Sequence, residues 1–311
     1  MVFAGTPAFA VPSLEALVTA GHQVRRVVTQ PDRPRGRGQH PAPPPVKEAA
    51  QRLGLPLWQP ERPEAQAWLE LLDEVEAEAL VVVAYAHKIP APVLARPRYG
   101  CINVHASLLP RWRGAAPIAR AILEGDRITG VTVMQMDEGW DTGPILLQAT
   151  EVIRPDDTAA SLHDRLAALG ARLLVQALAR LEAGTLAGVP QPGQGATLAP
   201  RLAKEEGAVD WSAPAERIAR QIRAFDPWPG AYTTLEGRRI RLVEAVPEPG
   251  AAGVAPGEIV GVDGPRGALL VGCGGGTTLR LLRVQPEGGR VMTGLDLANG
   301  MRLQPGRRFG G

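Results

Sequence analysis

The fold class of this 311-residue chain follows from one short stretch, Leu80–Tyr85, which reads LVVVAY. An unbroken apolar run of this length is typical of a strand covered on both faces, as in a parallel sheet with helices on each side. It is the longest apolar run in the chain, and a membrane-spanning helix needs roughly 20 such residues. The chain opens on MVFAG without a signal-like segment. We therefore expect a soluble, cytoplasmic α/β protein without a membrane partner.

Strand and helix patterns alternate around that run. The expected strands are residues 2–4, 24–29, 80–85, 100–104 and 130–136. The expected helices are residues 13–20, 45–53, 64–77, 116–123 and 161–181. Ser13 is the predicted N-cap of the first helix, and Ser161 with Asp164 forms a capping-box pattern at the last. This order predicts an open, mainly parallel, Rossmann-like sheet with helices on both faces.

The last third of the chain has a different pattern. Residues 189–200 are rich in Gly, Pro, Gln and Ala, which is typical of a linker. A helix at 213–224 then precedes short strands, separated by Gly and Pro, at 231–235, 238–246, 257–262, 268–271 and 277–284. Such a series predicts a small β-barrel. The expected domains are residues 1–188 and 207–311, with a linker at 189–206.

The composition excludes wholesale disorder, because 45% of the residues are hydrophobic and the formal net charge is only +2. Cys101 and Cys273 lie far apart in the sequence, so two reduced, buried thiols are expected. The histidines show no metal-ligand spacing, and no metal is predicted. Gly5 begins no dinucleotide-binding pattern, and Gly272–Gly276 is expected to be a hairpin turn.

The densest group of chemically active side chains lies in residues 101–114, CINVHASLLPRWRG. Alternate side chains of a strand share a face, so Asn103 and His105 would point the same way, about 7 Å apart. Ligands of open α/β sheets bind beyond the carboxyl ends of strands, where Ser107–Pro110 follow. An amide donor beside an imidazole suits a reaction that builds an oxyanion and moves a proton. Cys101 shares this face, but nothing nearby would activate its thiol as a nucleophile.

An acidic loop follows the next expected strand, with the sequence DEGWDTG at residues 137–143. A carboxylate placed there would hold the imidazole of His105 in one tautomer. The sequence does not choose between Asp137, Glu138 and Asp141.

A basic stretch at residues 31–40 reads PDRPRGRGQH. Its Pro and Gly content predicts a flexible loop that forms neither helix nor strand and projects from the carboxyl edge of the sheet. Clustered arginines on such a loop suit phosphate contacts, and Arg33, Arg35 and Arg37 are the candidates.

Taken in order, these motifs resemble the methionyl-tRNA formyltransferases over nearly the whole chain. The matching stretches are residues 3–7, 30–38, 103–118, 130–137, 141–143, 204–206, 210–212 and 222–230. The Asn-x-His…Asp core alone is common to enzymes that use 10-formyltetrahydrofolate. The arginine stretch and the second domain are more specific.

The resemblance implies formyl transfer from 10-formyltetrahydrofolate to the α-amino group of methionine on initiator methionyl-tRNA. We expect the protein to be a monomer. The resemblance implies that Asn103 and protonated His105 donate hydrogen bonds to the tetrahedral oxyanion while Asp141 stabilises the imidazolium. It also implies an OB-like barrel at 207–311 that contacts tRNA. The residues it assigns to folate are Ser107, Leu108, Leu109 and Pro110, and those it assigns to tRNA are Arg33, Arg35 and Arg37.

Three alternatives stay open at this point. One is a formyltransferase for a sugar nucleotide or purine precursor, against which the Pro31–Gly38 stretch argues. Another is a hydrolase that releases formate from the same co-substrate. Such an enzyme is expected to carry a regulatory domain before the catalytic sheet, whereas here the first expected strand already begins at Val2. The last is a non-catalytic RNA-binding protein, which the intact set of Asn103, His105 and Asp141 disfavours.

Overall fold

The computed structural model describes residues 1–311 except 36–39, 86, 251–252 and 311. The chain folds into two compact units that interleave along the sequence. Unit 1 comprises residues 1–117, 128–152 and 163–199, and unit 2 comprises residues 118–127, 153–162 and 200–311. None of the described helices is both long and apolar enough to cross a bilayer.

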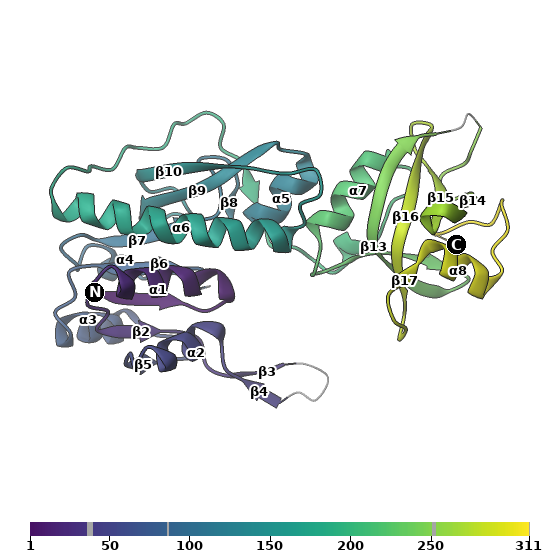
Figure 1. The fold of residues 1–311 in the computed structure, drawn as a ribbon. Coiled ribbons are helices and arrows are strands. Elements are labelled where there is room, and N and C mark those ends of the chain that lie inside the picture. The colour runs from purple at the N-terminus through teal and green to yellow at the C-terminus, as the bar shows by residue number, and fades with distance from the viewer. Residues whose placement is uncertain (36–39, 86, 251–252, 311) are drawn as a thin grey trace. The chain divides into compact units, whose positions relative to one another are not determined.

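Unit 1 is built on a seven-stranded sheet with the strand order β10-β9-β7-β6-β1-β2-β5 (Figure 1). Its strands are β1 Val2–Gly5, β2 Arg26–Val28, β5 Leu57–Trp58, β6 Leu80–Val83, β7 Cys101–His105, β9 Ile128–Gln135 and β10 Ile145–Val152. The five strands from β7 to β5 are parallel, whereas β9 runs antiparallel to β7 and to β10. The predicted mainly parallel sheet is therefore confirmed.

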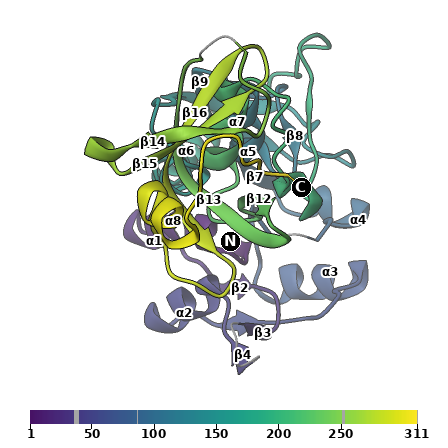
Figure 2. The same cartoon turned by 90° about the vertical axis from the view of Figure 1, so that its right-hand side faces the viewer.

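Helices cover both faces of this sheet (Figure 2). They are η1 Ala8–Ala10, α1 Val11–Thr19, α2 Pro45–Arg52, α3 Ala65–Glu74, α4 Ala91–Leu94 and α6 Ala159–Glu182. Trp68 of α3 and Val93 of α4 pack with Leu80 of β6 and Cys101 of β7 on one face. On the other face α6 lies so close that a Cβ on Gly170 would be 2.8 Å from Val104.

The capping residues predicted for two helices are wrong. Helix α1 begins at Val11 with a proline in its first turn, which leaves Ser13 buried inside the helix. At α6 the reciprocal cap is formed by Thr158 and Ser161, not by Ser161 and Asp164. The Thr158 hydroxyl accepts from the Ser161 amide at 3.2 Å, and the Ser161 hydroxyl accepts from the Thr158 amide at 3.1 Å. In both cases helical geometry extends further upstream than the apolar periodicity.

The basic stretch is wrongly predicted to lack strands. Strand β3 Arg33–Arg35 pairs antiparallel with β4 His40–Ala42, and the pair extends away from the main sheet (Figure 1). Its base is fixed by Asp32, which lies 2.7 Å from Lys47 Nζ and 2.9 Å from Gln59 Nε2. These hydrogen bonds hold the pKa of Asp32 below its ordinary value. Arg37 lies outside the described residues.

Unit 2 carries a separate antiparallel sheet in the order β12-β13-β16-β15-β14, with β17 paired to β16. Its elements are α5 Pro117–Glu124, η2 Glu205–Gly207, α7 Ala215–Ala224, β12 Ala231–Leu235, β13 Arg238–Pro249, β14 Ile259–Asp263, η3 Gly264–Arg266, β15 Ala268–Cys273, β16 Thr277–Pro286, β17 Met292–Thr293 and α8 Gly294–Met301. The first residue of α5, Pro117, is counted with the first segment of unit 1. The hairpin predicted at Gly272–Gly276 is confirmed, with Gly275 and Gly276 both at φ +66°. Trp211 stacks on Phe309 in the core, at a centroid distance of 5.5 Å.

A closed OB-like barrel is not confirmed. In the described part of the chain, no strand ladder joins β12 to β14 at the two ends of the sheet order. Instead the C-terminal segment, residues 307–310, bonds to both of them: Arg307 O accepts from Ile259 N at 2.7 Å, and Gly310 N donates to Thr234 O at 2.9 Å. Pro305 and the glycines at 306 and 310 keep this segment from forming a regular strand.

Candidate functional site

The structure brings Asn103, His105 and Asp141 together. Asn103 and His105 lie on the same face of β7, as their spacing predicts. Asn103 Nδ2 donates to Asp141 Oδ1 at 3.2 Å, and His105 Nδ1 lies 3.6 Å from Asp141 Oδ2. The imidazole is buried, with only 6% of the residue exposed. An amide, an imidazole and a carboxylate from two segments about 40 residues apart thus form one connected group.

Among the three candidate acids, only Asp141 reaches the imidazole. Asp137 closes its own turn, because its Oδ1 accepts from Gly139 N at 3.0 Å and from Thr142 Oγ1 at 2.7 Å. Glu138 is exposed to solvent. Asp141 has a φ of +54°, a left-handed conformation that Asp tolerates better than most residues.

The acidic loop, residues 137–143, approaches β7 from an unexpected direction. Since β9 runs antiparallel to β7, it ends beside the start of β7, where Met136 N donates to Cys101 O at 2.8 Å. The loop then folds back so that Asp141 lies against the side chains of Asn103 and His105. The site therefore covers the face of β7 and does not lie only beyond its carboxyl end.

Backbone groups of residues 112–114 complete the hydrogen bonding of the site. Gly114 N donates to Asp141 Oδ2 at 2.9 Å, and His105 Nε2 lies 2.8 Å from Trp112 O. Each nitrogen of the His105 ring thus faces a protein oxygen. The 2.8 Å contact of Nε2 with Trp112 O is a hydrogen bond, whereas the 3.6 Å between Nδ1 and Asp141 Oδ2 is an ion-pair distance too long for one. A direct hydrogen bond from His105 to a reacting oxygen, expected from the sequence, therefore requires either that Nδ1 turns from Asp141 or that the contact of Nε2 with Trp112 O breaks.

Asn103 has a donor to spare. A primary amide carries two N–H groups, and one of them is used on Asp141. In the described ranges no residue accepts the other. This second N–H is chemically able to donate to a substrate oxygen while the first stays bonded to Asp141.

The backbone of the predicted folate loop, Ser107–Pro110, is held by side chains of β9 and β10. Thr132 Oγ1 donates to Ser107 O at 2.7 Å and accepts from Leu109 N at 3.1 Å, and Gln148 Nε2 donates to Leu109 O at 2.9 Å. Ser107 and Leu109 are buried, and the Ser107 hydroxyl donates to a backbone oxygen inside the protein. The half-buried members of the loop are Leu108 and Pro110, so these are the side chains that can face a ligand.

Sequence reasoning missed residues in the segment whose composition indicates a linker. Gln191 Nε2 donates to Asp141 O at 2.8 Å, and Thr197 Oγ1 accepts from Trp112 N at 2.9 Å. Strand β11 Leu198–Ala199 pairs with β8 Arg113–Gly114 in a separate two-stranded sheet. Residues 189–199 are therefore part of unit 1. The sequence offers one indication of this pairing, the glycine at position 114. Gly114 has a φ of +121°, and a Cβ there would lie 2.7 Å from Ala199 O, so only glycine allows Ala199 to approach so closely.

The buried thiol near the site, Cys101, is in an environment that disfavours the thiolate. Burial raises the pKa of Cys101 to about 12, and its sulfur lies 3.6 Å from Val93 O. A thiol with that pKa is almost entirely protonated at neutral pH. Within the residues that the structure describes, no three His, Cys, Asp or Glu side chains are grouped to hold a metal.

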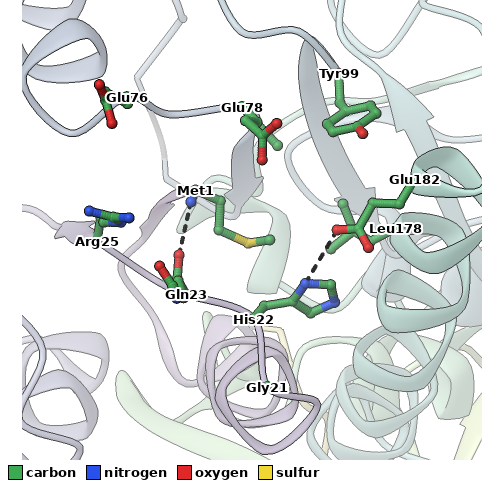
Figure 3. Close-up of a pocket in the computed structure, with 11 residues that line it drawn as sticks. Met1, Gly21, His22, Gln23, Arg25, Glu76, Glu78, Tyr99, Leu178 and Glu182 are labelled. Atoms are coloured by element: carbon green, nitrogen blue, oxygen red, sulfur yellow. Dashed lines mark hydrogen bonds and ion pairs between the residues drawn. The ribbon is translucent and has the colours of Figure 1, made fainter.

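A cavity of about 320 Å³ lies elsewhere in unit 1, beside Met1 at the start of β1 (Figure 3). There the amino terminus donates to Gln23 O at 2.9 Å, and His22 Nδ1 lies 3.6 Å from Glu182 Oε1. Burial lowers the pKa of the terminal amine. Neither β7 nor the acidic loop contributes to the lining, so this cavity is separate from the candidate site.

Comparisons with known proteins agree along the whole chain. The family model described as "Formyl transferase" matches residues 1–178, and the model "Formyl transferase, C-terminal domain" matches residues 201–302. The methionyl-tRNA formyltransferase of Heliobacterium modesticaldum is 48% identical, with 100% of this chain and 99% of that protein aligned. That of Anaeromyxobacter sp. (strain K) is 52% identical, with 97% of each chain aligned.

Solved structures with the same fold are more distant in sequence. An N-formyltransferase from Helicobacter canadensis, in complex with folinic acid and dTDP-3-aminofucose, has a TM-score of 0.66 at 18% identity, over 90% of this chain and 97% of that one. HypX from Aquifex aeolicus, in complex with tetrahydrofolic acid, has a TM-score of 0.63 at 19% identity, over 96% of this chain and 46% of that one. At these identities the likeness shows the shared fold alone.

Proposed function

The chain belongs to the methionyl-tRNA formyltransferase family, and we propose that it transfers the formyl group of 10-formyltetrahydrofolate to the α-amino group of methionine on initiator methionyl-tRNA, in the cytoplasm. The observation that carries the proposal is the connected group of Asn103, His105 and Asp141 in a chain about half identical to named methionyl-tRNA formyltransferases. A sugar-nucleotide substrate is less well supported, since the sugar formyltransferase WlaRD is only 17% identical.

The residues of the site support a direct acyl transfer. The amine attacks the formyl carbon, a C–N bond forms, and the carbonyl electron pair moves to oxygen. The second N–H of Asn103 donates to that oxyanion. In its protonated form His105, which lies between Asp141 and Trp112 O, places a positive charge beside it. When the tetrahedral intermediate collapses, the carbonyl re-forms, the bond to N10 breaks and N10 gains one proton. The attacking nitrogen loses one proton, so the transfer consumes and releases none overall.

The folate co-substrate is proposed to lie against Leu108 and Pro110, on the loop of Ser107–Pro110 that Thr132 and Gln148 support. Buried Ser107 and Leu109 would then act by shaping the loop. Two proteins with this fold have been solved in complex with folinic acid and with tetrahydrofolic acid, in agreement with this class of ligand.

The tRNA is proposed to contact the arm formed by β3 and β4, through Arg33, Arg35 and Arg37, and the antiparallel sheet of unit 2, as an open variant of an OB-like domain. The extended position of the arm and the exposure of Arg33 support this assignment.

One assay tests the proposed function directly. The purified protein is supplied with 10-formyltetrahydrofolate and, in parallel, with initiator methionyl-tRNA, elongator methionyl-tRNA or free methionine. Formylation that strongly favours the initiator tRNA is expected. Equal rates on all three acceptors, or formate release without transfer, would remove the proposal.

The arm is tested by the salt dependence of tRNA binding. Arg33→Ala and Arg37→Ala should each weaken binding and flatten the log–log salt slope by roughly 0.7–0.9 for each tRNA phosphate that the arginine had neutralised. Arg62→Ala, at another exposed arginine of unit 1, is the matched control. Unchanged slopes for both arm variants would remove the arm from the tRNA site.

A further inference from the structure

We propose that Gln191 is a positioning residue that holds the backbone of the acidic loop so that Asp141 faces His105. This inference rests on the proposed function, because it assigns a catalytic consequence to the placement of Asp141. Gln191 comes from the segment whose composition indicates a linker, and no motif marks it.

The side-chain amide of Gln191 uses its whole hydrogen-bonding capacity on the site. Its Nε2 donates to Asp141 O at 2.8 Å and to Gly143 O at 2.9 Å. Its Oε1 accepts from Arg113 Nε at 3.0 Å and from Arg113 Nη2 at 2.6 Å. A primary amide offers two donors and two acceptor lone pairs, and all four are satisfied here.

These bonds close a ring around Asp141. Arg113 is the chain neighbour of Gly114, and Gly114 N donates to Asp141 Oδ2 at 2.9 Å. Gln191 therefore fixes the backbone of Asp141, and Gly114 fixes its carboxylate, while Arg113 links the two supports. With both ends held, the carboxylate keeps its place relative to His105 Nδ1.

The loop needs this support. Asp141 is left-handed at φ +54°, and its neighbour Trp140 is 66% exposed, so little apolar packing holds that part of the loop. Displacing a catalytic group by about 1 Å costs on the order of 100-fold in rate. Support residues one contact removed from a reacting group typically contribute roughly 10- to 100-fold in activity.

The test compares three variants with the wild-type chain. Gln191→Met keeps the length of the side chain and removes all four bonds. Gln191→Glu keeps the acceptor for Arg113 and loses both donors to the loop. Both should lower kcat about 10- to 100-fold, with KM for either substrate within about twofold, since the interaction matters in the transition state. Gln194→Ala, at an exposed position of the same segment, should leave kcat unchanged.

A double variant separates positioning from general structural damage. If Gln191 acts through Asp141, Gln191→Met should cost less than about threefold once Asp141→Asn is present, because effects of residues that act as a unit are not additive. A full 10- to 100-fold loss in that background would overturn the proposal. So would Gln191→Met with wild-type kcat.

Amide hydrogen exchange gives a readout that does not depend on activity. Residues 137–143 should exchange faster in Gln191→Met than in wild type or Gln194→Ala, whereas β6 should be unchanged. A wild-type chain that fails to formylate any tRNA refutes the proposed function. Unchanged exchange at 137–143 in Gln191→Met refutes the positioning role, whatever the wild-type activity.

Discussion

Replacing Asp141 by Asn removes one negative charge and one hydrogen-bond acceptor from the site. The carbonyl of the new amide still accepts from Gly114 N, so the loop keeps its anchor. The new NH₂ group, however, faces Asn103 Nδ2, and two donors cannot bond to each other. Asn103 must then turn its own amide, which moves its free N–H away from the oxyanion.

The size of the effect follows from the distance between His105 Nδ1 and Asp141 Oδ2, 3.6 Å. At an effective dielectric constant of about 20, a carboxylate at that distance stabilises an imidazolium by roughly 4.6 kcal/mol. Since about 1.4 kcal/mol corresponds to a tenfold change in rate, kcat of Asp141→Asn should fall about 10³-fold. KM should change little, because the charge acts mainly on the transition state.

The assay is steady-state formylation of initiator methionyl-tRNA, with circular dichroism to confirm that the variant is folded. Asp137→Asn is the matched control, since it changes a carboxylate of the same loop that bonds only within its own turn. It should retain near-normal turnover. The reasoning is refuted if Asp141→Asn stays within about threefold of wild type, or if Asp137→Asn loses as much activity.

Three further predictions concern stability and reactivity. Thr132→Val removes a buried hydroxyl that bonds the backbone of Leu109 and Ser107, so the free energy of unfolding, measured by urea denaturation, should fall by about 2–3 kcal/mol. Thr132→Ser keeps the hydroxyl and should lower the free energy of unfolding by about 1 kcal/mol. Because burial raises its pKa to about 12, Cys101 should resist iodoacetamide at pH 8 in the native protein, and Cys101→Ala should keep wild-type kcat. Arg120 holds the pKa of Glu206 below its ordinary 4.5, so the ionised carboxylate stabilises the fold above that pH and ceases to as the pH falls through the folded pKa. Glu206→Gln should therefore be less stable than wild type by about 0.5–1 kcal/mol at pH 7, and the difference in Tm should vanish once the pH has fallen below the lowered pKa of the folded state.

Much of unit 1 can be predicted from apolar patterning, because its central strands are buried on both faces. The run at Leu80–Tyr85 and the alternation in residues 101–105 locate β6 and β7 to within two residues. The end of β6 is misjudged because Ala84 takes a φ of +49°, which stops the strand although the sequence stays apolar. The apolar pattern of the sequence does not indicate that the backbone turns at this residue.

The candidate site is only partly readable from the sequence. The spacing of Asn103 and His105 fixes their common face, but choosing Asp141 over Asp137 requires knowing which carboxylate closes its own turn. The role of Gln191 cannot be predicted from the sequence, for another reason. This residue bonds backbone carbonyls, which every residue possesses, from a segment whose Gly and Pro content is typical of a linker.

The return of residues 189–199 to unit 1 limits how genes of this family can recombine. An exchange of coding sequence at residue 188 would pair one parent's loop of Asp141 with the other parent's Gln191 and Thr197. Two supports of the site would then be inherited with the second half of the chain. Chimeras joined after Ala199, where β11 ends, keep these supports with the loop they hold and should retain more activity than chimeras joined at 188.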